Sequence, residues 1–209
     1  MEQRNERPGA SGGGARPAGP PAVAVVDTIT KLDAGHRGAV VVAASHGGLY
    51  AGYCAAKGGV RAVILNDAGI GRDRAGTGSL DYLDRIGMAA ATASHLSCRI
   101  GDGKDMEANG VVSHVNAAAA ALGCRPGQTV RECAALMRAA PMPEGSVPAM
   151  SESRFTIREE PGEPRVIGVD SASLLRPEDE GQILVTASHG ALLGGKPDSA
   201  VSVPVLAAV

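Results

Sequence analysis

Aromatic residues are almost absent from this chain, whose 209 residues include three Tyr, one Phe and no Trp. The core must therefore consist of Ala, Val, Leu and Ile, and small residues of this kind allow helices to pack closely on a sheet. Few rings are present for bases to stack on, and the formal net charge is −2 without a basic stripe. Nucleic acid is therefore not expected as a partner.

Paired cysteines and long apolar runs are also lacking. The four cysteines show no Cys-x-x-Cys pattern and no metal-ligand spacing, which predicts reduced thiols in a cytoplasmic protein. No apolar run reaches the length that spans a bilayer, and nothing resembles a secretory signal, so no membrane association is expected. The cysteines are Cys54, Cys98, Cys124 and Cys133.

Composition divides the chain into four parts. Residues 1–22 are rich in Gly and Pro and predict a disordered tail, because they cannot bury enough apolar surface. Residues 23–138 form a first α/β unit. Five prolines and scattered charges between residues 139 and 165 predict a linker, with an edge strand at 155–157. Residues 166–209 restart the apolar pattern.

One stretch of the chain occurs twice. Residues 27–49 align without a gap on residues 170–192, at an offset of 143, and nine of the 23 positions are identical. In both copies an apolar run ends at Ser-His-Gly, which is typical of a buried strand that ends in a turn. The second copy lacks a convincing helix after this turn. We therefore expect residues 166–209 to be an incomplete repeat that packs on the first.

The last apolar run, residues 203–209, resembles a buried strand. A chain that stops inside such a strand leaves an apolar edge, so we expect a truncated form of a longer two-repeat protein. The alternative is that the second half has degenerated in place. The exposed last strand also predicts self-association into a homo-oligomer.

The first unit has the pattern of a parallel sheet. Apolar strands are predicted at 39–44, 60–65 and 88–93, with a helix at 49–57 and another that begins at Ser79 as N-cap. Two strands joined by a helix are parallel, with a right-handed crossover. The predicted fold class is α/β, with a mainly parallel sheet flanked by helices and built from two related βαβ repeats, the second incomplete.

Polar residues follow each predicted strand. The three strands end at Ser45-His46, Asn66-Asp67 and Ser94-His95. The carboxyl ends of parallel strands lie on one edge of the sheet, where open α/β sheets bind ligands. We therefore expect these side chains to form one site. The alternative is that they are turn residues which cap the following helices.

Each residue type suggests a role in this site. His46 would be the general acid or base, Asp67 its orienting carboxylate or a second acid or base, and His95 an auxiliary group. Two glycines at a helix start expose backbone N–H groups that suit an anion. The catalytic candidates are Ser45, His46, Asp67 and His95, and the substrate-binding candidates are Gly47, Gly48, Asn66, Ser94, Ser188 and His189.

Residues 43–47 resemble the nucleophile elbow of the α/β-hydrolases, with alanine for the first glycine. The resemblance extends over some 30 residues and implies Ser45 as a nucleophile. That fold has several strands before its elbow, whereas this chain offers at most one, and the turn recurs at 186–190. The family is therefore not assigned, and an N-capping or anion-binding hydroxyl is the favoured role of Ser45.

A divalent metal is left open by the sequence. His46, His95 and Asp67 match a zinc-like ligand set, or equally a general base with its orienting carboxylate. The acidic turn at 102–107 with His114 has no diagnostic ligand spacing.

These features predict a small-molecule enzyme that uses acid–base chemistry, of the hydrolase or the lyase/isomerase type, on a polar or anionic substrate. Two alternatives stand beside it. The protein is a non-catalytic anion-binding or assembly protein, or it is the inactive remnant of a longer enzyme.

Overall fold

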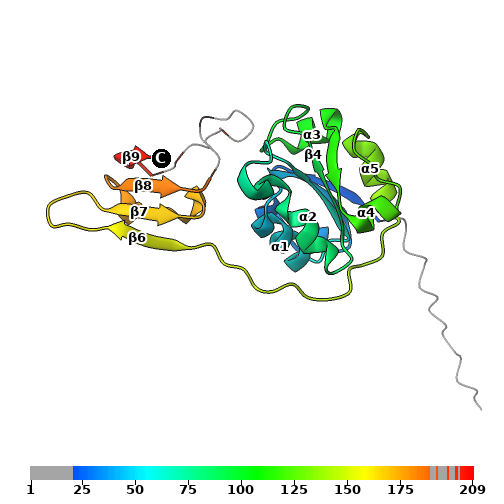
Figure 1. Ribbon diagram of the computed structural model, residues 1–209, viewed down its shortest axis with the longest axis horizontal. Coiled ribbons are helices and arrows are strands. Elements are labelled where there is room, and N and C mark those ends of the chain that lie inside the picture. Colours follow the sequence, from blue (N-terminus) through cyan, green and yellow to red (C-terminus); the bar gives the residue numbers. More distant parts are fainter. Residues whose placement is uncertain (1–20, 189–191, 193–196, 198–200, 202) are drawn as a thin grey trace, which may run out of the picture.

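The computed structural model describes residues 21–188, 192, 197, 201 and 203–209 (Figure 1). Most of the predicted tail and the substrate-binding candidate His189 lie outside these residues. The α/β class is confirmed, because the described chain forms two mixed sheets with mostly parallel strands. No helix in this part of the chain is long and apolar enough to cross a bilayer.

The first sheet has five strands in the order β1-β2-β3-β4-β5. The first four are parallel, and β5 runs antiparallel to β4. The predicted strands thus lie side by side in chain order, which places their carboxyl ends on one edge. The strands are β1 (Val23–Val26), β2 (Val40–His46), β3 (Ala62–Asn66), β4 (Ala89–Ala93) and β5 (Val112–Val115).

Helices cover both faces of this sheet (Figure 1). One face packs against α1 (Leu49–Lys57) and α2 (Gly78–Asp84). The other packs against α3 (Gly103–Asn109), α4 (Ala117–Ala121) and α5 (Val130–Met137). Because β2, β3 and β4 are buried on both faces, their sequences are continuous apolar runs rather than alternating ones.

Short 3-10 turns connect several of these elements. Two of them, η1 (Ile29–Lys31) and η2 (Ala34–His36), lie between β1 and β2, where the sequence predicts a turn or short helix. A third, η3 (Arg72–Thr77), precedes α2.

Ser79 does not begin a helix, so that prediction is wrong. Helix α2 starts one residue earlier, with Thr77 at the N-cap position. The Ser79 hydroxyl instead donates a hydrogen bond of 2.7 Å to the Gly47 carbonyl, and its backbone N–H donates to the same oxygen. Ser79 therefore fastens α2 to the turn that follows β2.

The segment between α5 and the second sheet lies along the first unit up to about Met150. Val147 and Met150 pack against the core beneath α1 and α2. The Tyr82 hydroxyl donates a hydrogen bond of 3.2 Å to the Pro148 carbonyl. The first half of the predicted linker is therefore held to the surface of the first unit, although it forms neither helix nor strand.

The second sheet has four strands in the order β6-β7-β8-β9, of which only β6 is antiparallel to its neighbour. Turns η4 (Ala172–Leu174) and η5 (Pro177–Asp179) connect β7 to β8. The strand predicted at 203–209 is limited to two residues. The strands are β6 (Arg154–Arg158), β7 (Val166–Val169), β8 (Ile183–Thr186) and β9 (Ala207–Ala208).

The two sheets share one local geometry. Strands β7 and β8 pair in the same register as β1 and β2, 143 residues further on. The Ile29 N–H donates to the Ser45 hydroxyl at 2.8 Å, and the Ala172 N–H donates to the Ser188 hydroxyl at 2.9 Å. That the segments are repeats of one ancestral unit remains a prediction.

A buried ion pair stabilises the second sheet. Arg154 donates two hydrogen bonds, of 2.9 and 2.6 Å, to the fully buried Asp179. We expect Asp179→Ala to lower the free energy of unfolding by about 3–5 kcal/mol, because it leaves a largely buried guanidinium unpaired. Urea denaturation combined with hydrogen exchange of the β6–β8 amides measures this loss.

Glu178→Ala is the matched control. Glu178 is exposed and lies 3.7 Å from Arg176, so its removal should cost about 0–1 kcal/mol. Equal losses for the two variants would contradict the assignment of the buried pair.

Candidate functional site

The candidate site lies at the carboxyl ends of β2, β3 and β4. His46 is the register partner of Asn66, so β2 and β3 end side by side. The Asp67 N–H donates to the Ala93 carbonyl at 2.9 Å, which joins the ends of β3 and β4. The three polar strand endings are therefore neighbours along one edge, as parallel pairing requires.

Asp67 and His95 are in direct contact. The imidazole Nδ1 lies 2.8 Å from Asp67 Oδ1, and the backbone N–H of His95 donates to the same oxygen at 3.0 Å. The Gly69 N–H donates to it as well, at 3.1 Å. An ionised carboxylate only accepts hydrogen bonds, so His95 carries its proton on Nδ1 in the neutral form. Its Nε2 is then an acceptor.

Burial and hydrogen bonding act on the pKa of Asp67 in opposite directions. Burial is the largest single contribution and raises the pKa, because the side chain is only 4% exposed. Hydrogen bonds from the backbone and imidazole of His95 and from the Gly69 backbone act in the other direction and prevail. The pKa of Asp67 is therefore lowered, and the group is a carboxylate at neutral pH.

His95 reaches the surface at a cavity of about 510 Å3. Its side chain is 45% exposed, in contrast to the buried carboxylate that holds it. This volume suits a small metabolite. The cavity is lined by Asn66, Ala68, His95, Leu96, Ser97, Cys98, Arg99, Ile100, Asp105 and Asn109.

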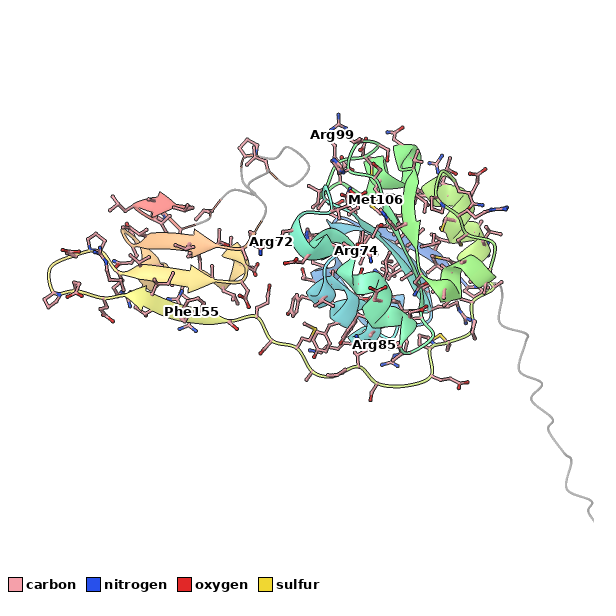
Figure 2. The ribbon with its side chains drawn as sticks, viewed as in Figure 1. Arg72, Arg74, Arg85, Arg99, Met106 and Phe155 are labelled. Carbon is pink, nitrogen blue, oxygen red and sulfur yellow. The ribbon has the colours of Figure 1, made fainter. Side chains whose placement is uncertain are left out.

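An ion pair between Arg99, whose side chain is 69% exposed, and Asp105 lies on the wall of this cavity. The Asp105 carboxylate accepts hydrogen bonds from the Arg99 backbone at 2.7 Å, from the Arg99 guanidinium at 3.0 Å and from the Asn109 amide at 3.0 Å. The pKa of Asp105 is lowered, chiefly by the Arg99 backbone N–H. Figure 2 shows Arg99 at the outer rim of the first unit. Sequence reasoning missed Arg99, because no motif marks it.

Asn66 and Ser94 hydrogen-bond the backbone of the loops next to the cavity. The Asn66 amide is fully buried, accepts a hydrogen bond from the Ala68 N–H at 2.8 Å and donates to the Cys98 carbonyl. The Ser94 hydroxyl accepts a hydrogen bond from the Leu96 N–H, and its carbonyl accepts from Ser97. Both residues therefore fold the backbone around His95.

The cavity offers no activated nucleophile among its lining residues. The Ser97 hydroxyl donates to the Ser94 carbonyl at 2.8 Å and accepts from the Val111 N–H at 2.9 Å, so both of its roles are occupied. Burial raises the pKa of the Cys98 thiol, which keeps it protonated.

Ser45 has a structural partner. Its hydroxyl accepts a hydrogen bond from the Ile29 N–H at 2.8 Å and lies 3.4 Å from the Thr28 hydroxyl. Ser188 makes the corresponding bond in the second sheet. Neither serine caps a helix: helix α1 has Gly48 at its N-cap, without a side-chain cap. Both hydroxyls hold the preceding 3-10 turn to the end of the strand.

The backbone N–H groups of Gly47 and Gly48 are also engaged. Gly47 donates to the Asn66 carbonyl at 2.7 Å, and Gly48 donates to Nδ1 of His46 at 3.1 Å. Both N–H groups of the predicted anion-binding site therefore already donate to acceptors of the protein itself. The imidazole bonded to Asp67 is that of His95, which was expected to be auxiliary.

Gly47 serves close packing. A Cβ added there would lie 2.2 Å from the Gly76 carbonyl oxygen. A Cβ on Gly76 would in turn lie 1.8 Å from the Asp67 carbonyl oxygen. The backbones of three segments therefore touch at the site, and only glycine permits this approach.

The loop after Asp67 has an unusual backbone. Ala68, Ile70, Asp73 and Arg74 all have positive φ, between 48° and 67°. Such angles cost energy in non-glycine residues and are concentrated at functional sites. The loop closes a turn in which the Ile70 N–H donates to the Asp67 carbonyl at 2.7 Å. Figure 2 shows Arg72 and Arg74 on this loop.

Among the described residues, no three His, Cys, Asp or Glu side chains come together as a metal-binding group. The zinc-like set of His46, His95 and Asp67 is therefore not assembled, nor is one in the acidic turn at 102–107.

Comparison of the chain with protein-family models, curated proteins and solved structures found no match.

We expect Gly47→Ala to destabilise the protein by about 1–3 kcal/mol, because the new methyl group would overlap backbone atoms that cannot turn aside. Gly48→Ala is the control. A Cβ at Gly48 would lie nearest to the His46 ring, at 2.8 Å, and a side chain can move more easily than the backbone. Denaturant unfolding of both variants tests this, and a Gly47→Ala protein as stable as the control would contradict it.

The lowered pKa of Asp67 predicts a pH-dependent stability. A depressed folded-state pKa contributes stability above the unfolded-state value of about 3.9, and this contribution is lost as the pH falls through the folded-state pKa. The stability difference between the wild type and Asp67→Asn should therefore shrink below about pH 4. The exposed Asp81 offers a control, because Asp81→Asn should change stability by less than about 0.5 kcal/mol. An undiminished difference at low pH would refute the assignment.

Proposed function

We propose that this protein is a small-molecule enzyme that transfers protons, with His95 as general acid or base and Asp67 as the carboxylate that orients it. The observation that supports the proposal most directly is the 2.8 Å contact between a buried carboxylate and an imidazole that lines a cavity. A base held by a second group within reach of a substrate is the usual arrangement for such catalysis.

The proposed substrate is small and polar, with an anionic group. Arg99 is the basic residue of the cavity lining; its guanidinium is 69% exposed, is bonded to Asp105 at 3.0 Å and would meet the anionic group. The engaged Ser97 hydroxyl and the protonated Cys98 thiol favour proton abstraction or activation of water over a covalent intermediate. A lyase, isomerase or direct hydrolase reaction therefore fits better than an acyl-enzyme mechanism.

The proposed compartment is the cytoplasm. All four cysteines are free, which suits a reducing environment.

A second candidate function is that of a non-catalytic assembly protein. It is favoured by one observation: the polar groups of Ser45, Gly47 and Gly48 are all directed at the chain itself. In that case the Asp67–His95 bond would only fasten the ends of β3 and β4 together.

The experiment compares two Asp–His pairs of the same geometry. His36 Nδ1 lies 2.8 Å from Asp33 Oδ1, but the Asp33 side chain is 74% exposed and neither residue lines the cavity. A panel of small carboxylates and phosphate monoesters is screened by thermal shift and then for turnover. His95→Gln should abolish the ligand-induced shift or lower turnover by about 10²–10⁴-fold, whereas His36→Gln should change neither.

Asp67→Asn separates the two candidate functions. Under the enzyme proposal it lowers turnover while ligand binding remains, because the misoriented imidazole still lines the cavity. Full turnover in His95→Gln would refute the catalytic role. The assembly role would be favoured if the wild type shows no ligand response and His95→Gln fails to fold in the absence of ligand.

A further inference from the structure

The loop after β4 carries two backbone donors that the rest of the described chain does not use. The N–H groups of Cys98 and Ile100 donate to no residue that the structure describes, whereas the N–H of Arg99, between them, donates to the Asp105 carboxylate at 2.7 Å. Cys98 and Ile100 both line the cavity beside His95.

The N–H of Cys98 needs an acceptor. Cys98 is only 6% exposed, and a buried backbone N–H is almost always hydrogen-bonded, to protein, to water or to a ligand. The other polar groups of this residue are engaged: its thiol donates to the Ser94 carbonyl at 3.6 Å, and its carbonyl accepts from the Asn66 amide at 3.4 Å. The N–H is therefore the group of Cys98 that an occupant of the cavity can satisfy.

The Arg99 guanidinium also has donors to spare. Its Nη1 donates to Asp105 at 3.0 Å, while Nε and Nη2 donate to none of the described residues, and the side chain is exposed. The Nε and Nη2 edge of a guanidinium matches the two oxygens of a carboxylate, whose remaining lone pairs can accept backbone N–H groups. Residues 98–100 thus offer donors to one small anion.

The charges on the cavity wall favour an anion with a single charge. Among the described residues that line the cavity, Arg99 is the one Lys or Arg, and Asp105 is the one Asp or Glu. A phosphate monoester carries nearly two negative charges at neutral pH, whereas a carboxylate carries one. The second charge of a phosphate would lie near Asp105 without a second cation, and like charges at short range repel.

We propose that the N–H groups of Cys98 and Ile100 and the Arg99 guanidinium form the subsite for the anionic group of the substrate, and that this group is a carboxylate rather than a phosphate. The inference rests on the proposed function, because it names the substrate class of the same cavity. His95 is not a donor of this subsite, so anion binding and proton transfer can be measured separately.

Titration of the isotope-labelled full chain with acetate, followed by two-dimensional amide NMR, tests the subsite. The amide protons of Cys98 and Ile100 should move downfield and saturate, because they gain an acceptor. That of Gly101 should stay in place, since it already donates to the Ala44 carbonyl at 2.7 Å. Methyl phosphate, used as the second probe, should bind about tenfold more weakly than acetate.

Three variants test the role of charge. Arg99→Gln should weaken acetate binding by about tenfold or more, because it removes charge-assisted hydrogen bonds. Arg72→Gln removes the same charge from a side chain that is 94% exposed and does not line the cavity, and it should leave acetate binding unchanged. Asp105→Asn should reduce the preference for acetate over methyl phosphate, because it removes the charge that opposes a dianion.

Amide protons of Cys98 and Ile100 that do not respond to acetate in the wild type would overturn the inference. Equal losses of acetate affinity in Arg99→Gln and Arg72→Gln would also overturn it, because the attraction would then act only at long range. Tighter binding of methyl phosphate than of acetate would overturn the assignment of a carboxylate. None of these outcomes coincides with failure of the proposed function, which is judged by the turnover of His95→Gln.

Discussion

The hydrogen bonds to the Asp67 carboxylate are the constraint on which the candidate site depends. A buried charge is costly unless it is hydrogen-bonded, and Asp67 accepts hydrogen bonds from Gly69 in its own loop and from the backbone and imidazole of His95, which follows β4. These donors belong to two different segments. The carboxylate therefore helps to position both His95 and the loop after β3.

The sequence was sufficient for the general architecture and for the edge on which the site lies. The apolar runs before Ser45, Asn66 and Ser94 are uninterrupted, as expected of strands that are buried on both faces. Parallel pairing of such strands then brings their carboxyl ends together. The pairing within the site was not predictable. Which imidazole meets Asp67 depends on strand register and on the bend after β4, and His46 and His95 look alike in the sequence.

The contacts of two further residues could not be predicted for the same reason. Serine and glycine at a strand end suggested an N-capping or anion-binding hydroxyl and an anion site, whereas Ser45 bonds a turn that lies 16 residues earlier and Gly47 packs against a loop that lies 29 residues later. Contacts across such separations leave no local signal. Arg99 was overlooked because no motif marks it, and its partner Asp105 lies on a helix that the sequence suggested only as a turn.

Ala68 and Ile70, the two residues with positive φ that follow Asp67 most closely, affect the stability of the fold and the rigidity of the loop in opposite directions. Glycine at Ala68 or Ile70 would relieve the steric cost of a positive φ, which is about 1–2 kcal/mol per residue. The same substitution would widen the range of conformations open to the loop and so loosen its hold on the carboxylate. Selection for a more robust fold and selection for a well-aligned imidazole would therefore favour different residues at these two positions.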